Sequence, residues 1–360
     1  KDAIILQQLA VIRTMTERNL RSMGDDFWGT PFEGVLSPKS PSAPPSGGKP
    51  VGSADGKMPA QPSDGKTAGG QPAAKAEKTE VVEPLPKEDM KDLQAELDSY
   101  IGLATVKEEV RNLINMASVY KLRRQHDLPT TDMSLHMVFT GNPGTGKTMM
   151  ARMMARIYRS LDILSKGQLV EVDRSGLVAG YVGQTAIKTQ KVIQKAIGGV
   201  LFIDEAYALN GKSENDFGQE AIDTILKAME DHRDDLVVIV AGYTDLMDRF
   251  IHSNPGLESR FNRFLLFEDY TPDEMLDIFK MQCKKGCYQL SDGVEELVRD
   301  YITEENGDPE TFGNARGVRN IFEHILVAQN NRLAAMETVT KEDLMTLTQD
   351  DVLHARGKLD

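Results

Sequence analysis

The residues with the clearest chemical meaning form the segment 141–148, which reads GNPGTGKT. Gly141, Gly146, Lys147 and Thr148 have the spacing G-x-x-x-x-G-K-[ST] of a phosphate-binding loop. The glycines let the backbone wrap closely, so that its N–H groups point at phosphate oxygens. Lys147 can reach the β- and γ-phosphates, and Thr148 can ligate magnesium. A plain Gly-rich turn would explain the glycines but not a Lys-Thr pair at this offset, so the segment predicts a nucleoside triphosphate site.

A second candidate site lies at residues 199–205, where the sequence GVLFIDE ends an apolar run in two acids. Buried acids at a strand end are costly unless they hold a metal ion or another partner. Asp204 would hold the magnesium ion, directly or through water, and Glu205 would orient and activate an attacking water. A strand followed by Asp-Glu is a weak signal alone, but downstream of a phosphate loop it indicates hydrolysis.

A parallel sheet is needed to position both segments. Short apolar runs predict strands, and the helical patterns between them imply βαβ units and an α/β fold. Further helical patterns after residue 270 predict a small all-helical second domain. The expected strands are 135–140, 169–172, 200–203, 236–241 and 264–267, and the expected helices include 88–125, 147–160, 272–284, 293–305, 315–336 and 341–355.

Composition restricts the function classes. The 360 residues carry a net charge of −13, which argues against nucleic acid as a partner, because phosphate neutralisation needs a basic face. No apolar run approaches the roughly 18 residues of a membrane-spanning helix, so we expect no membrane insertion. The two cysteines, Cys283 and Cys287, lack the spacing of a zinc pair and are interpreted as reduced thiols, which predicts a cytoplasmic location.

Changes in composition divide the chain into four segments. Residues 1–35 combine a short helical stripe with an aromatic cluster around Trp28. Residues 36–87 are rich in Pro, Gly, Ser, Ala and Lys, and are predicted to form a disordered linker. Residues 88–270 are expected to form the nucleotide-binding α/β domain, and residues 271–360 the helical domain.

With these residues in view, the chain resembles the AAA+ ATPases over residues 88–360. More narrowly it is similar to the subgroup of stage V sporulation protein K, red-type (CbbX-like) Rubisco activase and the ATPases of type VII secretion. The resemblance implies a P-loop NTPase parallel sheet with flanking helices, the AAA+ large domain, followed by a helical lid. It is carried by LDSYIGLATVKEEV (97–110), GNPGTGKT (141–148), GYVGQT (180–185), LFIDEAYAL (201–209), VAGYTDLM (240–247), NPGLESRF (254–261) and GNARGVRN (313–320).

The resemblance implies ATP and Mg2+ as ligands and assigns further residues to their site. Thr244 would act as sensor 1, between the acids and the γ-phosphate, with Tyr243 as the alternative. Arg316 would act as sensor 2, which contacts the nucleotide from the lid. The nucleotide-binding set comprises Ile101 and Gly102 beside the adenine, then Asn142, Pro143, Gly144, Thr145, Gly146, Lys147, Thr148 and Met149.

Two more assignments concern other protein chains. Arg260 would be the arginine finger that reaches the nucleotide of a neighbouring subunit, with Arg263 as the alternative. Tyr181, with Val182 beside it, would line the pore of a ring and grip a substrate protein. The competing interpretation of GYVGQT is an ordinary turn with Tyr181 packed in the core.

The function expected from these residues is ATP-driven remodelling of a substrate protein by a homo-oligomeric ring of six subunits. The alternative is a nucleotide-dependent switch or scaffold in a larger assembly, which the long linker would suit. A nucleic-acid motor is disfavoured by the acidic charge. No residue identifies the substrate protein, and the linker with its N-terminal segment departs from the minimal plan of a Rubisco activase.

Overall fold

The computed structural model describes residues 83–129, 134–181, 183–211 and 217–357. The N-terminal segment expected over 1–35, nearly all of the expected linker, and Val182 lie outside these ranges. The described end of that linker contacts the α/β domain, because the Leu85 N–H donates to the carbonyl of Lys166 at 2.9 Å.

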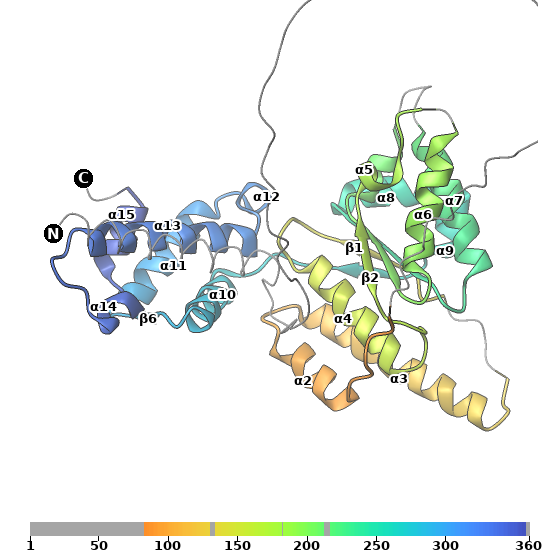
Figure 1. The fold of residues 1–360 in the computed structure, drawn as a ribbon, viewed down its shortest axis with the longest axis horizontal. Coiled ribbons are helices and arrows are strands. Elements are labelled where there is room, and N and C mark those ends of the chain that lie inside the picture. Colours follow the sequence, from red (N-terminus) through yellow and green to blue (C-terminus); the bar gives the residue numbers. More distant parts are fainter. Residues whose placement is uncertain (1–82, 130–133, 182, 212–216, 358–360) are drawn as a thin grey trace, which may run out of the picture. The chain divides into compact units, whose positions relative to one another are not determined.

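Five parallel strands form the central sheet, in the spatial order β2-β3-β4-β1-β5. Figure 1 labels β1 and β2 of this sheet. The predicted parallel sheet is therefore confirmed. The first strand begins two residues later than predicted, and the last ends one residue earlier. The strands are β1 (Met137–Thr140), β2 (Leu169–Val172), β3 (Val200–Ile203), β4 (Val237–Gly242) and β5 (Phe264–Leu266).

Helices cover both faces of this sheet. Successive side chains of a strand point to opposite faces, so an apolar strand gives the sheet two apolar faces to bury. On β3, Leu201 and Ile203 join the apolar core formed with the helices that lie between β2 and β5 in sequence. Phe202 is fully buried on the opposite face, which α4 covers. These helices are α4 (Lys147–Ser160), α5 (Arg174–Leu177), α6 (Gln184–Ala196), the 3-10 helix η1 (Ala206–Leu209), α7 (Gly218–Asp231), α8 (Thr244–His252) and α9 (Pro255–Arg260).

The helical pattern over residues 88–125 forms two helices that are separated by a tight turn. Gly102 and Leu103 have φ angles of 61° and 57°, which a right-handed helix cannot contain. The Asp89 side chain accepts a hydrogen bond from the Lys91 N–H and so caps the first helix. The two helices are α2 (Met90–Ser99) and α3 (Ala104–Gln125).

After residue 271 the chain forms a helical domain around Phe279 and Phe322, whose ring centroids are 5.6 Å apart. The single helix predicted over 341–355 is wrong, because Thr348 caps a new helix and a short strand precedes it. No helix in the described part of the chain is both long and apolar enough to cross a membrane. The elements are α10 (Pro272–Lys285), α11 (Val294–Glu305), α12 (Pro309–Phe312), α13 (Ala315–Ala334), α14 (Lys341–Met345) and α15 (Gln349–Ala355), with the parallel pair β6 (Gln289–Leu290) and β7 (Thr346–Leu347).

Candidate functional site

The glycine-rich segment 141–146 connects the carboxyl end of β1 to the first turn of α4. Gly146 is the N-cap of α4, and its φ of 95° lies in the left-handed region that favours glycine. The first N–H groups of α4 have no partner within the helix and carry its positive partial charge. Thr148 lies half-buried in this first turn, and Met149 is buried. A loop of this shape can bind an anion with its backbone N–H groups.

The ammonium group of Lys147 is turned back onto the same loop. Its Nζ donates to the carbonyl oxygens of Gly141 at 2.8 Å and Asn142 at 2.7 Å. Burial lowers the pKa of Lys147 to about 8, Arg316 adds to this effect, and Asp204 opposes it. Neutral carbonyls compensate a buried cation poorly, so the site favours a negatively charged ligand beside Lys147.

The two acids that follow β3 lie at the same edge of the sheet as the phosphate loop. The Asp204 N–H donates to the carbonyl of Val172, and the Asp204 carboxylate accepts from the Glu205 N–H at 3.0 Å. Glu205 has a φ of 48°, a left-handed conformation that is uncommon outside glycine. The expectation of two buried acids is wrong, because Asp204 is half-buried and Glu205 is exposed. The turn leaves the Glu205 carboxylate accessible to water.

The donor set at this edge suits a magnesium ion. Thr148 offers a hydroxyl oxygen and Asp204 a carboxylate oxygen, which are hard ligands of the kind that Mg2+ takes. Within the described ranges, no group of three or more His, Cys, Asp or Glu side chains could hold a metal ion. Magnesium bound by one or two protein oxygens normally completes its shell with substrate phosphates and water. The residues present therefore fit a metal that arrives with a phosphorylated ligand.

The carboxyl end of β4 joins the phosphate loop directly, since the carbonyl of Gly242 accepts from the Gly141 N–H at 3.2 Å. Tyr243 follows as the half-buried N-cap of α8, with its ring centroid 6.2 Å from that of Tyr207. Thr244 is the first residue of α8 and is exposed. The charge of Glu205 contributes to the raised pKa of Tyr207, about 12, after the larger effect of burial. Both sensor 1 candidates thus follow directly on the strand that joins the phosphate loop.

The turn between α2 and α3 meets the far end of the phosphate loop. Ile101 and Gly102 are half-buried there. A Cβ atom built on Gly102 would lie 3.1 Å from the Tyr270 ring, and one built on Gly146 would lie 3.5 Å from the Tyr270 hydroxyl. Tyr270 and Leu103 therefore belong to this wall of the site, although the sequence assigned no role to either.

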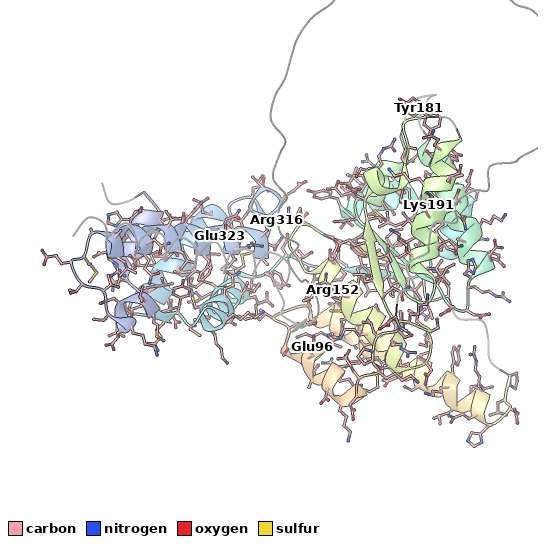
Figure 2. The ribbon with its side chains drawn as sticks, in the orientation of Figure 1. Glu96, Arg152, Tyr181, Lys191, Arg316 and Glu323 are labelled. Carbon is pink, nitrogen blue, oxygen red and sulfur yellow. The ribbon has the colours of Figure 1, made fainter. Side chains whose placement is uncertain are left out.

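Arg316 lies in the first turn of α13 and is exposed (Figure 2). Its charge contributes to the lowered pKa of Lys147, which places the two cations near each other. The preceding Ala315 N–H donates to the carbonyl of Gly144 at 3.3 Å. The start of α13 thus contacts the phosphate loop, as a sensor 2 assignment requires.

The arginine-finger candidates lie at the opposite end of the sheet. The Arg260 guanidinium bonds Glu230 at 3.2 Å rather than Glu258, its nearest acidic neighbour in sequence. The Arg263 Nε donates to the carbonyl of Ser134 at 3.1 Å, ahead of β1. The four residues of β1 span about 13 Å between this end and the phosphate loop. The structure therefore does not bring either arginine to the phosphate loop of its own chain.

Tyr181 lies between α5 and α6, and 74% of its surface is exposed. Figure 2 shows its side chain at the outer end of the α/β domain. The interpretation in which Tyr181 packs in the core is wrong. Thr185 fixes the base of the loop, where its Oγ1 accepts from the Ala179 N–H at 3.0 Å.

Comparisons with known proteins agree with this geometry. The family model described as "ATPase family associated with various cellular activities (AAA)" matches residues 137–269, and the AAA lid domain model matches residues 271–359. The chloroplastic ribulose bisphosphate carboxylase/oxygenase activase of Cyanidioschyzon merolae is 45% identical over 273 residues, which cover 75% of this chain and 92% of that protein. Stage V sporulation protein K of Bacillus subtilis is 40% identical over 265 residues, which cover 73% and 82%.

Solved structures show the same fold at low sequence identity. The AAA domain of FIGL-1 superposes with a TM-score of 0.51 at 18% identity, covering 72% of this chain and 82% of that one. A mutant of Thermotoga maritima RuvB superposes with a TM-score of 0.50 at 19% identity, covering 73% and 71%.

The fold and the phosphate loop define a P-loop ATPase with a helical lid, and the chain belongs to the AAA ATPase family. It is an ATP-hydrolysing enzyme. Within that family it groups with Rubisco activase and stage V sporulation protein K, which confirms the resemblance read from its motifs.

Proposed function

We propose that the chain is a ring-forming AAA+ ATPase that remodels a substrate protein. The observation that carries the proposal is the exposure of Tyr181 at the end of a glycine-flanked loop on the nucleotide-binding domain. An exposed aromatic side chain offers an extended polypeptide apolar contact that tolerates many sequences. Rubisco activase and stage V sporulation protein K differ in the systems that their names specify, so the substrate protein stays open.

In this proposal the residues around the phosphate loop divide the chemistry of hydrolysis. The loop N–H groups and Lys147 bind the β- and γ-phosphates. Thr148 and Asp204 would hold Mg2+, which would supply positive charge beside the phosphates. Glu205 accepts a proton from the water whose oxygen attacks the γ-phosphorus, and ADP leaves. Thr244 is proposed to orient that water, with Tyr243 as the alternative.

The position of Arg260 supports a site shared between subunits. Because Arg260 lies at the far end of β1 from its own phosphate loop, it can stabilise a transferring phosphoryl group only on another chain. Arg316 would contact the nucleotide from the lid of the same chain and so transmit phosphate loss to α13. We place this homo-oligomer, a hexamer by family resemblance, in the cytoplasm, where its free Cys283 and Cys287 would stay reduced.

Mixing two inactive variants tests the shared site. Lys147→Ala destroys a chain's own phosphate site, whereas Arg260→Ala removes only the arginine. We expect each variant alone to lose ATP hydrolysis and an equal mixture to regain part of it, because some sites then combine an intact loop with an intact arginine. Arg249→Ala, an exposed arginine on α8, is the control and should stay active alone. A mixture as inactive as its components would exclude the shared site.

A photo-crosslinking side chain at position 181 separates remodelling from switching. It is placed in the Glu205→Gln background, which is expected to bind ATP without turnover. We expect ATP, but not ADP, to give cross-links from position 181 to a protein other than the chain itself. The same side chain at the exposed Asp245 on α8 is the control. Equal cross-linking at both positions, or none with ATP, would favour the switch or scaffold function instead.

A further inference from the structure

The carbonyl groups of the phosphate loop all have hydrogen-bond donors, and several of these donors come from outside the loop. In a trans peptide the C=O of one residue and the N–H of the next point in opposite directions. The donors to the Pro143, Gly144 and Thr145 carbonyls come from outside the loop, so they hold the N–H groups of the next residues turned away from them, toward a bound phosphate. The bonds are Lys147 Nζ to Gly141 (2.8 Å) and Asn142 (2.7 Å), Asn314 Nδ2 to Pro143 (3.2 Å), the Ala315 N–H to Gly144 (3.3 Å) and the Tyr270 hydroxyl to Thr145 (3.3 Å).

Asn314, at the start of the lid helix α13, is the centre of this arrangement. It has no exposed surface. Its Nδ2 donates to the Pro143 carbonyl and, at 2.8 Å, to the Asp269 carboxylate, while its Oδ1 accepts from the Tyr270 N–H at 2.9 Å. Two acceptors on one side and a donor on the other fix the orientation of the amide. Asp269 also accepts from the Asn142 side chain, at 3.0 and 2.9 Å, so it links loop and lid a second time.

The backbone at this junction is held in a conformation that its sequence does not favour. Asn314 has φ 53° and ψ −124°, which residues with a side chain rarely adopt. Such a conformation persists only where surrounding contacts over-determine it. The contact is close, since a Cβ atom built on Gly144 would lie 2.1 Å from the Gly313 carbonyl oxygen. At Gly144 the lid and the phosphate loop therefore meet backbone to backbone.

We propose that Asn314 is a positioning residue of the nucleotide site, which acts on bound phosphates through the Pro143 carbonyl. Contact with Gly313 and Asn314 of the lid holds the Pro143–Gly144 peptide with its N–H facing the phosphates. A shift of the lid releases that peptide and lowers the affinity for the phosphate chain, with no involvement of the Arg316 side chain. Nucleotide affinity and lid position are thereby coupled through the loop itself. The inference rests on the proposed nucleotide site and adds a residue to it.

The test compares nucleotides that differ in their phosphates, measured on the full chain by displacement of a fluorescent ADP analogue. Asn314→Gly removes the amide but tolerates the backbone conformation. We expect the Kd of ADP to rise about tenfold, as for the loss of a buried hydrogen bond to a main-chain group. The Kd of AMP should change less than about twofold, since adenine contacts are untouched. A general defect of the lid would weaken both nucleotides alike.

Two further variants keep the test decisive if Asn314→Gly folds poorly. Asn314→Asp loses the donor to Pro143 and places two carboxylates together, so ADP should bind more weakly still. Adding Asp269→Asn removes that repulsion and should recover part of the affinity but not all of it, because the Pro143 bond stays absent. Arg319→Ala, whose guanidinium bonds Glu323 on the same helix, is the control for damage to the lid.

Equal losses for ADP and AMP, or full recovery in the double variant, would overturn the inference. Failure of the unmodified chain to bind ADP would instead overturn the proposed site. The steady-state expectation is separate from both: KM for ATP should rise in Asn314→Gly, while kcat at saturating ATP stays within about twofold, because the lost bond acts on binding.

Discussion

Nucleotide binding should be coupled to proton uptake through Lys147. Lys147 is half-buried, its Nζ donates to two neutral carbonyls, and the loss of solvation lowers its pKa to about 8. Arg316 lowers this pKa further, whereas Asp204 and Asp269 oppose the effect. Phosphate oxygens placed beside Lys147 favour the charged form, so its pKa must rise when a nucleotide binds. Binding above neutral pH therefore takes up a proton.

The size of the effect follows from the pKa of about 8. About half of the free chains carry a neutral lysine at pH 8 and about nine-tenths at pH 9, so binding should take up about 0.5 and 0.9 protons, and almost none at pH 6. The affinity should consequently fall about tenfold between pH 7 and pH 9. The unfolded chain binds the extra proton between about pH 8 and 10.4, so the stability of the free chain should rise with pH across that window.

Isothermal titration calorimetry with Mg-ADP measures this uptake directly, in Tris and in HEPES at each pH. The two buffers differ in ionisation enthalpy, so the difference between the observed heats gives the number of protons exchanged. Lys147→Arg is the matched control, because a guanidinium stays charged throughout this range and should show no uptake. Uptake that does not vary with pH, or that persists in Lys147→Arg, would refute the reasoning.

Three further outcomes concern stability and the loop. The Arg156 side chain is 15% exposed and forms ion pairs with Glu88, just ahead of α2, and with Glu96 on α2. Arg156→Ala should therefore lower the free energy of unfolding in urea by about 3 kcal/mol. Arg111→Ala removes only an exposed ion pair with Asp98 on α2 and should cost at most about 1 kcal/mol. Equal losses would contradict this. Gly144→Ala should weaken ADP binding at least tenfold, because its Cβ would meet the lid backbone at 2.1 Å, while Gly357→Ala, with a similar positive φ but open space, should leave ADP binding unchanged. The Tyr158 hydroxyl is buried and has no hydrogen-bond partner among the described residues. In thermal and urea unfolding, Tyr158→Phe should therefore leave the free energy of unfolding unchanged or raise it by up to about 1 kcal/mol. A decrease of more than about 1 kcal/mol would show that the hydroxyl has a partner after all.

Local patterns allowed much of the fold to be predicted. The three central strands β1, β3 and β4 are short apolar runs that are buried throughout, whereas the edge strands β2 and β5 keep exposed residues. The lid was predicted less well at its C-terminal end. Residues 341–355 have a helical pattern throughout, yet they contain the strand β7, which pairs with β6 more than fifty residues earlier. That pairing depends on a partner strand which no local window contains.

The sequence by itself determined which residues can handle phosphate, because Gly141, Lys147 and Thr148 lie within one loop whose shape follows from their own spacing. Only the tertiary structure decided how other residues relate to that loop. It exposed Glu205, placed Arg260 beyond reach of its own loop, and joined Asn314 to Pro143 across 171 residues. The physical reason is that hydrogen bonds and burial between distant segments depend on how the sheet and lid pack, which residue spacing along the chain does not encode.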